Sequence, residues 1–84
     1  IKLFMEPPNS RSNYWLQTLI LEKKYQNELE KILEYTNQLG IMTRPAWELL
    51  NNLDMFKDCP RAPLPIAESL AKRIINIPSS AFLI

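Results

Sequence analysis

The side chains best suited to binding a ligand are Arg11, Asn13, Tyr14, Arg44 and Trp47, which fall in loops or at the ends of predicted strands. Rigid elements commonly present binding residues at such places. An arginine fork can grip phosphate or carboxylate, and a nearby indole can stack on a base or a sugar. Arg44 and Trp47 would therefore suit a nucleotide-linked ligand. On spacing alone, a surface salt bridge for the arginine and a core position for the tryptophan are the commoner roles.

No catalytic constellation accompanies these residues. The chain has no histidine, so Ser79 and Ser80 lack the usual base for nucleophilic catalysis, and a turn or helix cap suits them better. Cys59 is the single cysteine, cannot form an internal disulfide, and is predicted to be a small buried hydrophobe. The carboxylates are scattered, which leaves a metal site without support. None of the six lysines lies in an apolar segment suited to Schiff-base chemistry.

Length and charge exclude several classes of protein. Eighty-four residues allow one small domain, and a formal net charge of +1 gives no basic field for nucleic acid or for a membrane surface. Tyr14 and Trp15 could form a stacking platform for nucleic acid, but in a nearly neutral chain their burial is the better prediction. No apolar run is long enough to span a membrane, and a lone cysteine fits a cytoplasmic setting. The apolar ends of the chain predict a fragment of a larger protein.

Two long elements organise the chain. Residues 13–21 are β-prone and nearly uncharged, and both alternating side-chain sets are mostly apolar, which predicts a central strand covered on two faces. Residues 25–39 carry apolar side chains at steps of three and four, which predicts an amphipathic helix. Gly40, the only glycine, is placed for a left-handed C-cap. Residues 1–5 could end a strand, and residues 6–10 are a proline-containing loop.

The second half is expected to be more irregular. A short strand over residues 41–44 should end at Pro45, and one helical turn should follow over 47–50. Residues 51–65 are expected to be irregular but anchored to the core by Met55 and Phe56. A second helix should start at Pro65 and run to Arg73, with Ile66 among its inward residues. A third short strand is predicted over 75–77. The apolar tail that starts at Ser79 is expected to dock on another surface.

These elements predict an α/β fold: a small two-layer domain with a short mixed sheet of about three strands, covered by two main helices. The order strand, helix, strand favours a right-handed crossover or a helix packed on a small mixed sheet. Residues 1–84 would then form a single domain.

Motifs along almost the whole chain resemble the C-terminal part of the DegT/StrS sugar aminotransferases. The matching stretches are residues 6–16, 40–47, 57–60, 67–70 and 75–80. The strings Ser12-Asn13-Tyr14-Trp15-Leu16 and Gly40-Ile41-Met42-Thr43-Arg44-Pro45-Ala46-Trp47 are similar to the branch that aminates nucleotide-linked keto sugars for legionaminic-acid-type glycans. Many relatives carry a histidine after the Gly-Ile strand, where this chain reads Arg44-Pro45-Ala46-Trp47.

The resemblance implies a pyridoxal-phosphate enzyme of aminotransferase fold type I, which works as a homodimer. It would move an amino group from glutamate to a 4-keto sugar on a nucleotide diphosphate. The family's cofactor lysine lies in a large N-terminal domain, so no lysine here would inherit that role, and this small domain alone should bind no cofactor and be inactive. The resemblance places Arg11 and Asn13 near the active-site cleft, and we expect Arg44 and Trp47 to face the sugar nucleotide.

Two other functions remain open at the level of sequence. The apolar ends could belong to an autonomous interaction module without catalytic activity, which would bind a protein partner through them. If the chain is instead a fragment of the aminotransferase, truncation would expose the surface that meets the large domain, and we expect the isolated chain to self-associate. A nucleic-acid binder is disfavoured by the charge alone.

Overall fold

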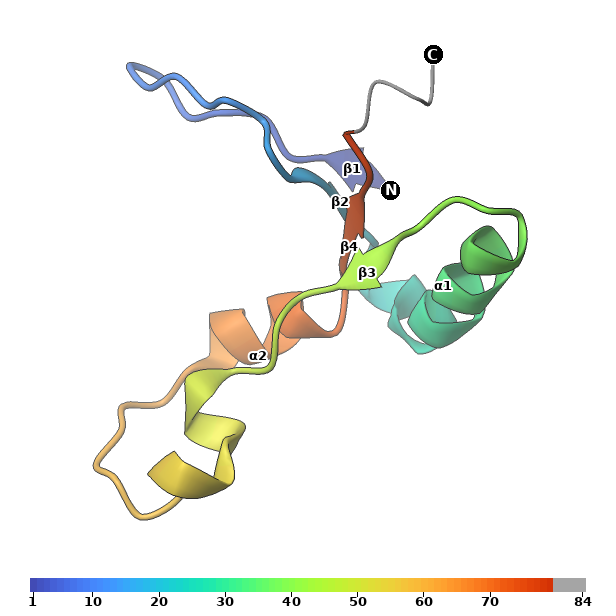
Figure 1. The fold of residues 1–84 in the computed structure, drawn as a ribbon. Coiled ribbons are helices and arrows are strands. Elements are labelled where there is room, and N and C mark those ends of the chain that lie inside the picture. The colour runs from blue at the N-terminus through green and yellow to red at the C-terminus, as the bar shows by residue number, and fades with distance from the viewer. Residues whose placement is uncertain (80–84) are drawn as a thin grey trace.

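A four-stranded antiparallel sheet lies at the centre of the computed structural model, which describes residues 1–79. Its strands are β1 (Lys2–Leu3), β2 (Gln17–Ile20), β3 (Arg44–Pro45) and β4 (Ile74–Ile77), in the order β1-β2-β4-β3 (Figure 1). β2 and β4 pair from Gln17 opposite Ile77 to Ile20 opposite Ile74. These two interior strands carry the β-branched residues that favour a pleated, covered surface.

The sheet differs in two respects from the predicted mixed sheet of about three strands: it has four strands, and all of its pairings are antiparallel. β4 is antiparallel to both β2 and β3, so these two run in the same direction but are not neighbours. The expected strand, helix, strand unit is therefore present, with β4 inserted between its strands. The strand predicted over 41–44 is present only as Arg44–Pro45, so it begins three residues late and includes the proline. The edge position of β3 permits this, because prolines within sheets are found on edge strands.

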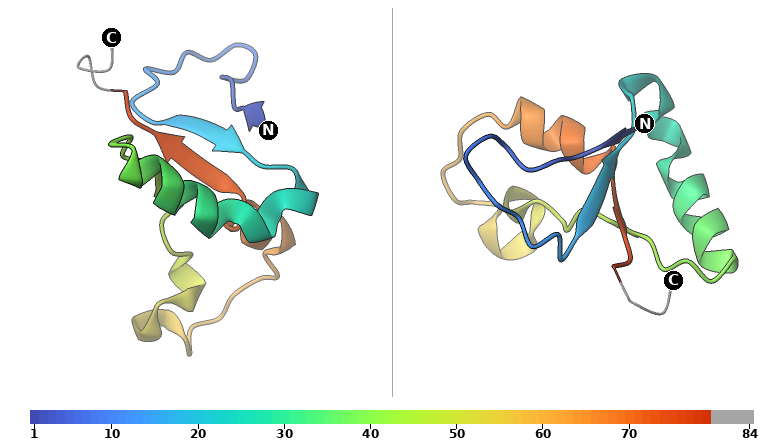
Figure 2. Two further views of the ribbon diagram at one scale, coloured as in Figure 1. Left: turned by 90° about the vertical axis from the view of Figure 1, so that its right-hand side faces the viewer. Right: turned by 90° about the horizontal axis from the view of Figure 1, so that it is seen from above.

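The predicted helix over 25–39 is confirmed in its main part. A 3-10 segment, η1 (Lys23–Glu28), leads into α1 (Leu29–Gln38). Gly40 has φ +85°, its N–H donates to the carbonyl of Asn37, and the Ile41 N–H donates to the carbonyl of Thr36. This is a Schellman motif, and it satisfies helix carbonyls that would otherwise lack donors. α1 lies along one face of the sheet, which gives the two-layer arrangement of the predicted α/β class (Figure 2).

The second helix, α2 (Pro65–Ala71), begins at Pro65 as predicted and ends two residues early. Two 3-10 turns, η2 (Leu50–Asn52) and η3 (Asp54–Phe56), replace the turn expected over 47–50 and part of the irregular segment. Together with α2 they project from the sheet on the side away from α1 (Figures 1 and 2).

Little of the described structure is buried. The accessible surface is 7232 Å², against about 5,200 Å² for a compact monomer of this mass. The radius of gyration is 14.8 Å, against roughly 12 Å for a compact domain of this length. Three of residues 1–79 are almost fully buried: Leu21, Thr43 and Ile75. The core therefore lies where β4 meets its neighbours, and large apolar side chains remain uncovered elsewhere.

Several burial predictions are consequently wrong. Five residues that were expected in the core are all exposed: Trp15, Met55, Phe56, Cys59 and Ile66. The reason is geometric: Trp15 lies before β2 begins, and the other four lie on η3, on the loop that follows it or on α2, where no layer of residues 1–79 covers them. The predicted docking of the apolar tail concerns residues 80–84, which lie outside the described residues.

Candidate functional site

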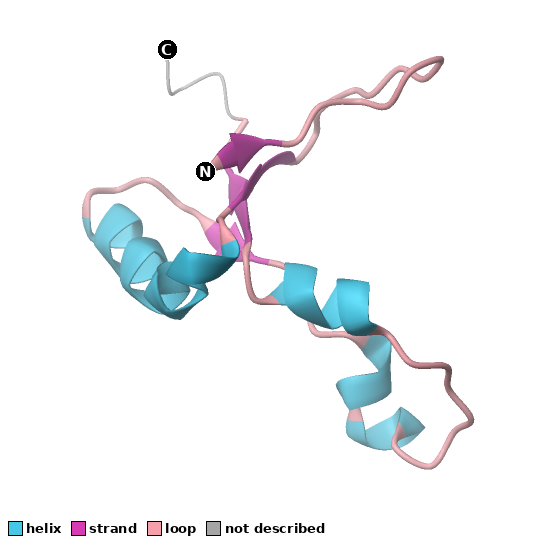
Figure 3. Ribbon diagram, turned by 180° about the vertical axis from the view of Figure 1, so that it is seen from behind, coloured by secondary structure: helices cyan, strands magenta, loops and turns pink. Residues whose placement is uncertain are grey.

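The segment between β1 and β2 forms an arm that projects from the sheet (Figures 1 and 3), and it carries Arg11 and Asn13. Two side chains on the arm bond to backbone two residues ahead: Ser12 Oγ accepts from the Tyr14 N–H and Asn13 Oδ1 accepts from the Trp15 N–H, each at 3.0 Å. Tyr14 has φ +48°, a left-handed conformation that is costly for a residue other than glycine. This conformation ends the extended run predicted from residue 13 and delays β2 to Gln17.

The backbone of Trp15 is fixed by hydrogen bonds, whereas its side chain is exposed. Its N–H is bonded to Asn13, and its carbonyl accepts a hydrogen bond of 2.9 Å from the Ser79 hydroxyl, which follows β4. The residue is nevertheless 68% exposed. An exposed indole on a fixed backbone is ready to stack on a ligand with little further ordering cost.

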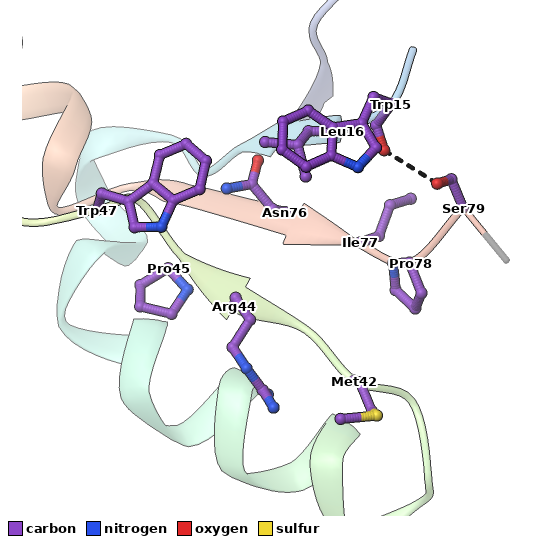
Figure 4. Close-up of a pocket in the computed structure, with 10 residues that line it drawn as sticks. All are labelled: Trp15, Leu16, Met42, Arg44, Pro45, Trp47, Asn76, Ile77, Pro78 and Ser79. Atoms are coloured by element: carbon purple, nitrogen blue, oxygen red, sulfur yellow. Dashed lines mark hydrogen bonds between the residues drawn. The ribbon is translucent and has the colours of Figure 1, made fainter.

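A hollow of about 250 Å³, here called the tryptophan hollow, lies between Trp15 and a second exposed indole, Trp47. Its wall includes Arg44 and Pro45 of β3 and Asn76 of β4 (Figure 4). Trp47 is 74% exposed, so the core position that spacing alone favoured is wrong. Residues from three distant parts of the sequence therefore line one hollow, with Asn76 of β4 between the two indoles (Figure 4).

The guanidinium of Arg44 lies against α1. Its Nη1 donates to Asn37 Oδ1 and to the Thr43 carbonyl, each at 2.8 Å. Figure 4 shows the side chain extending toward the helix and away from the two indoles. No ion pair involves Arg44 among residues 1–79, so the expected surface salt bridge is replaced by hydrogen bonds to neutral groups. Arg44 forms a side wall of the hollow, with Nη1 already engaged.

A polar cluster around the buried Thr43 supports that arrangement. Thr43 is 3% exposed, and its Oγ1 lies 2.6 Å from Thr36 Oγ1 and 3.2 Å from Asn37 Nδ2. Asn37 Nδ2 also donates to the Leu33 carbonyl at 2.7 Å. These bonds join the last turns of α1 to the start of β3 and so fix the position from which Arg44 leaves the backbone.

Asn76 faces the hollow between the two indoles (Figure 4). Its Oδ1 accepts a hydrogen bond of 2.8 Å from Thr18 Oγ1 on the neighbouring strand β2. That bond fixes the amide orientation, and it leaves the Nδ2 donors for another partner.

The five candidate binding residues are thus divided between two places. Arg44 and Trp47 line the tryptophan hollow, and Asn13 does not line it but accepts a hydrogen bond from the backbone N–H of Trp15, which does. Arg11 and Tyr14 line a separate hollow on the arm. Sequence reasoning missed Trp15 and Asn76 as site residues. The available signal for Trp15 was Asn13 two positions earlier, because asparagine in that position commonly forms a turn with the backbone.

The described residues do not form a pyridoxal-phosphate site. A lysine that binds this cofactor lies in a desolvated pocket, whereas all six lysines of the chain are exposed. Residues 1–79 also contain no cluster of three or more metal-ligating side chains. In the same part of the chain, none of the helices combines the length and apolarity required to traverse a bilayer.

Comparison with curated proteins found no match, and neither did comparison with solved structures. The sequence profile of the DegT/DnrJ/EryC1/StrS aminotransferase family matches residues 1–83, which is nearly the whole chain. The chain belongs to the DegT/DnrJ/EryC1/StrS aminotransferase family.

Proposed function

We propose that this chain is the C-terminal small domain of a pyridoxal-phosphate aminotransferase that transfers an amino group, from glutamate, to a nucleotide-linked 4-keto sugar. The observation that supports this most directly is the tryptophan hollow, where Trp15 and Trp47 stand exposed on either side of Asn76 in a chain of this family. Exposed aromatic faces with a few placed polar groups suit a sugar or base ring. The resemblance of residues 12–16 and 40–47 to the legionaminic-acid-type branch supports a role in surface-glycan biosynthesis.

The domain's part would be to bind and enclose the substrate, because its lysines are all exposed. In this proposal the Schiff-base lysine is supplied by a large cofactor-binding domain, and the two domains form the cleft between them. The enzyme would be a cytoplasmic homodimer, and the isolated small domain would be inactive.

The test is an assay of the full-length enzyme that carries this chain. Purified enzyme with added pyridoxal phosphate and glutamate should convert a nucleotide-linked 4-keto sugar to the amino sugar and release 2-oxoglutarate in equal amount. Omitting the keto sugar is the control for glutamate breakdown. A full-length enzyme that forms no amino sugar from any of the uridine, guanosine or thymidine diphosphate 4-keto sugars would contradict the proposal.

Replacing Arg44 by alanine in the full-length enzyme should raise the KM for the sugar nucleotide by about 2- to 10-fold, the equivalent of about 0.5–1.5 kcal/mol. The change removes one wall of the tryptophan hollow together with the exposed and part-buried hydrogen bonds that hold it to Asn37 and to the Thr43 carbonyl. Steady-state kinetics measures the effect, with Arg61→Ala as a matched control, because Arg61 is exposed on the loop between η3 and α2. An unchanged KM and an unchanged turnover for Arg44→Ala would refute a role for this residue in the site.

A second function, an interaction module without catalytic activity, is favoured by one observation: the described residues leave roughly 2,000 Å² more surface accessible than a compact monomer would. Exposed apolar patches of more than a few hundred Å² commonly mark association surfaces. Self-association of residues 1–84 produced alone is also expected under the aminotransferase proposal, because the surface that would meet the large domain is then uncovered. In either case the mean mass from light scattering should rise with concentration. A strict monomer at high concentration would contradict this prediction.

A further inference from the structure

We infer that the tryptophan hollow holds one neutral, oxygen-bearing ring of the nucleotide sugar, stacked against Trp15 and Trp47, with Asn76 Nδ2 donating a hydrogen bond to a ring substituent. The inference rests on the proposed function and goes beyond it in two ways. It assigns binding to Trp15 and Asn76, and it makes Arg44 a positioning residue that builds the wall of the hollow and does not bind the diphosphate.

The size of the hollow supports a single ring. A pocket that takes a whole drug-sized ligand commonly measures about 300–1,000 Å³, and the tryptophan hollow measures about 250 Å³. Its two indoles come from opposite borders: Trp15 precedes β2 and Trp47 follows β3. A ring placed between them would meet aromatic surface at both borders, and such surfaces stabilise sugar and base rings by stacking.

The charge of the lining argues against a diphosphate in the same place. Among the described residues that line the hollow, Arg44 is the only charged one. Its Nη1 is already bonded to Asn37 Oδ1 and to the Thr43 carbonyl, and the side chain extends away from the indoles (Figure 4). A diphosphate placed there would lack the convergent cationic donors that usually bind it. The diphosphate would therefore lie outside the hollow.

Asn76 determines which polar group the ligand must present to the hollow. The bond from Thr18 Oγ1 occupies Asn76 Oδ1, so the amide presents N–H donors and the ligand must supply an acceptor. Carbonyl and hydroxyl oxygens of a sugar or a base meet that requirement. Thr18 does not line the hollow, so its role is to orient the amide.

The test is binding to the full-length enzyme by isothermal titration calorimetry. The probes are UDP-N-acetylglucosamine, GDP-mannose and thymidine diphosphate glucose, each compared with its free nucleoside diphosphate. Trp15→Ala and Trp47→Ala should each weaken binding of the best probe roughly 5- to 150-fold, the range typical of one stacked ring. Asn76→Asp keeps an acceptor for Thr18 but removes the donors, and should weaken binding about 10-fold or more.

Two further comparisons identify the ring and the role of Thr18. If the hollow holds the sugar, these substitutions leave the affinity for the free nucleoside diphosphate unchanged; if it holds the base, that affinity falls in parallel. Thr18→Val should weaken sugar-nucleotide binding, and Thr18→Ser, which keeps the hydroxyl, should restore it. Leu50→Ala, on an exposed residue outside the hollow, is the control for general effects of substitution.

The inference is overturned if folded Trp15→Ala, Trp47→Ala and Asn76→Asp all bind the best probe as wild type does. It is also overturned if the wild-type enzyme binds none of the three probes. These results are separate from the assay of amino transfer, because an enzyme can transfer the amino group and still bind its substrate without these residues. Circular dichroism of each variant establishes that a loss of affinity is not a loss of fold.

Discussion

Replacing Ile75 by alanine is expected to lower the free energy of unfolding by about 2–5 kcal/mol, the usual range for truncating a buried isoleucine. Ile75 is 1% exposed, and it is the largest fully buried side chain in the described structure. It lies on β4 opposite Leu19 on one side and Pro45 on the other. The truncation would leave a cavity where β4 meets β2 and β3, and few other buried side chains could compensate.

Urea unfolding of the purified protein, followed by circular dichroism, measures the change. Ile66→Ala is the matched control, because it removes the same atoms from a residue that is 74% exposed on α2. Its effect should stay within about 0.5 kcal/mol, as is usual for surface positions. Equal losses for the two variants would contradict the placement of the core at β4.

The contrast between these two isoleucines also shows what the sequence could predict. Local signals fixed α1 and its end, because apolar spacing and a glycine at the C′ position act over a few residues. Pro65 likewise predicted the start of α2, and β4 was predicted within one residue of its bounds. The α/β class followed from the order of these elements.

Burial could not be predicted in the same way, because it depends on which segments fold back over a residue. Trp15 alternates with the apolar residues of β2, yet the left-handed Tyr14 places it before the strand. Ile66 has the spacing of an inward helical residue, but α2 projects beyond the sheet (Figure 2). Side-chain periodicity indicates which face is apolar, and only the tertiary arrangement determines whether anything covers it.

The candidate site was predictable in part for a related reason. Arg44 and Trp47 were identified by their chemistry and their place in a loop, and both do line the tryptophan hollow. The direction of the Arg44 side chain depends on Asn37, seven residues away on α1, and on the Thr43 carbonyl. Asn76 joined the site through the β2–β4 register, which brings it opposite Thr18. No local pattern specifies such long-range pairings.

Substitution of Thr43 is expected to cause the second large loss of stability, because Thr43 is the one buried polar residue of the described structure. Thr43→Val keeps the shape of the side chain and removes the hydroxyl that lies near Thr36 Oγ1 and Asn37 Nδ2. Two part-buried hydrogen bonds are lost, and at about 0.5–1.5 kcal/mol each the free energy of unfolding should fall by about 1–3 kcal/mol. The measurement is again urea unfolding of the purified protein.

A double-mutant cycle with Thr36→Val separates the lost hydrogen bond from general damage. If the two hydroxyls stabilise each other across the 2.6 Å contact, the double variant should lose less stability than the sum of the single losses, by about 0.5–3 kcal/mol. Strict additivity would contradict a direct bond between them.

Because Asn37 joins this cluster to Arg44, Thr43→Val should also raise the KM for the sugar nucleotide in the full-length enzyme, whereas Ile66→Ala should leave it unchanged. A raised KM for Thr43→Val together with an unchanged KM for Ile66→Ala would show that the cluster around Thr43 holds the wall of the tryptophan hollow in place.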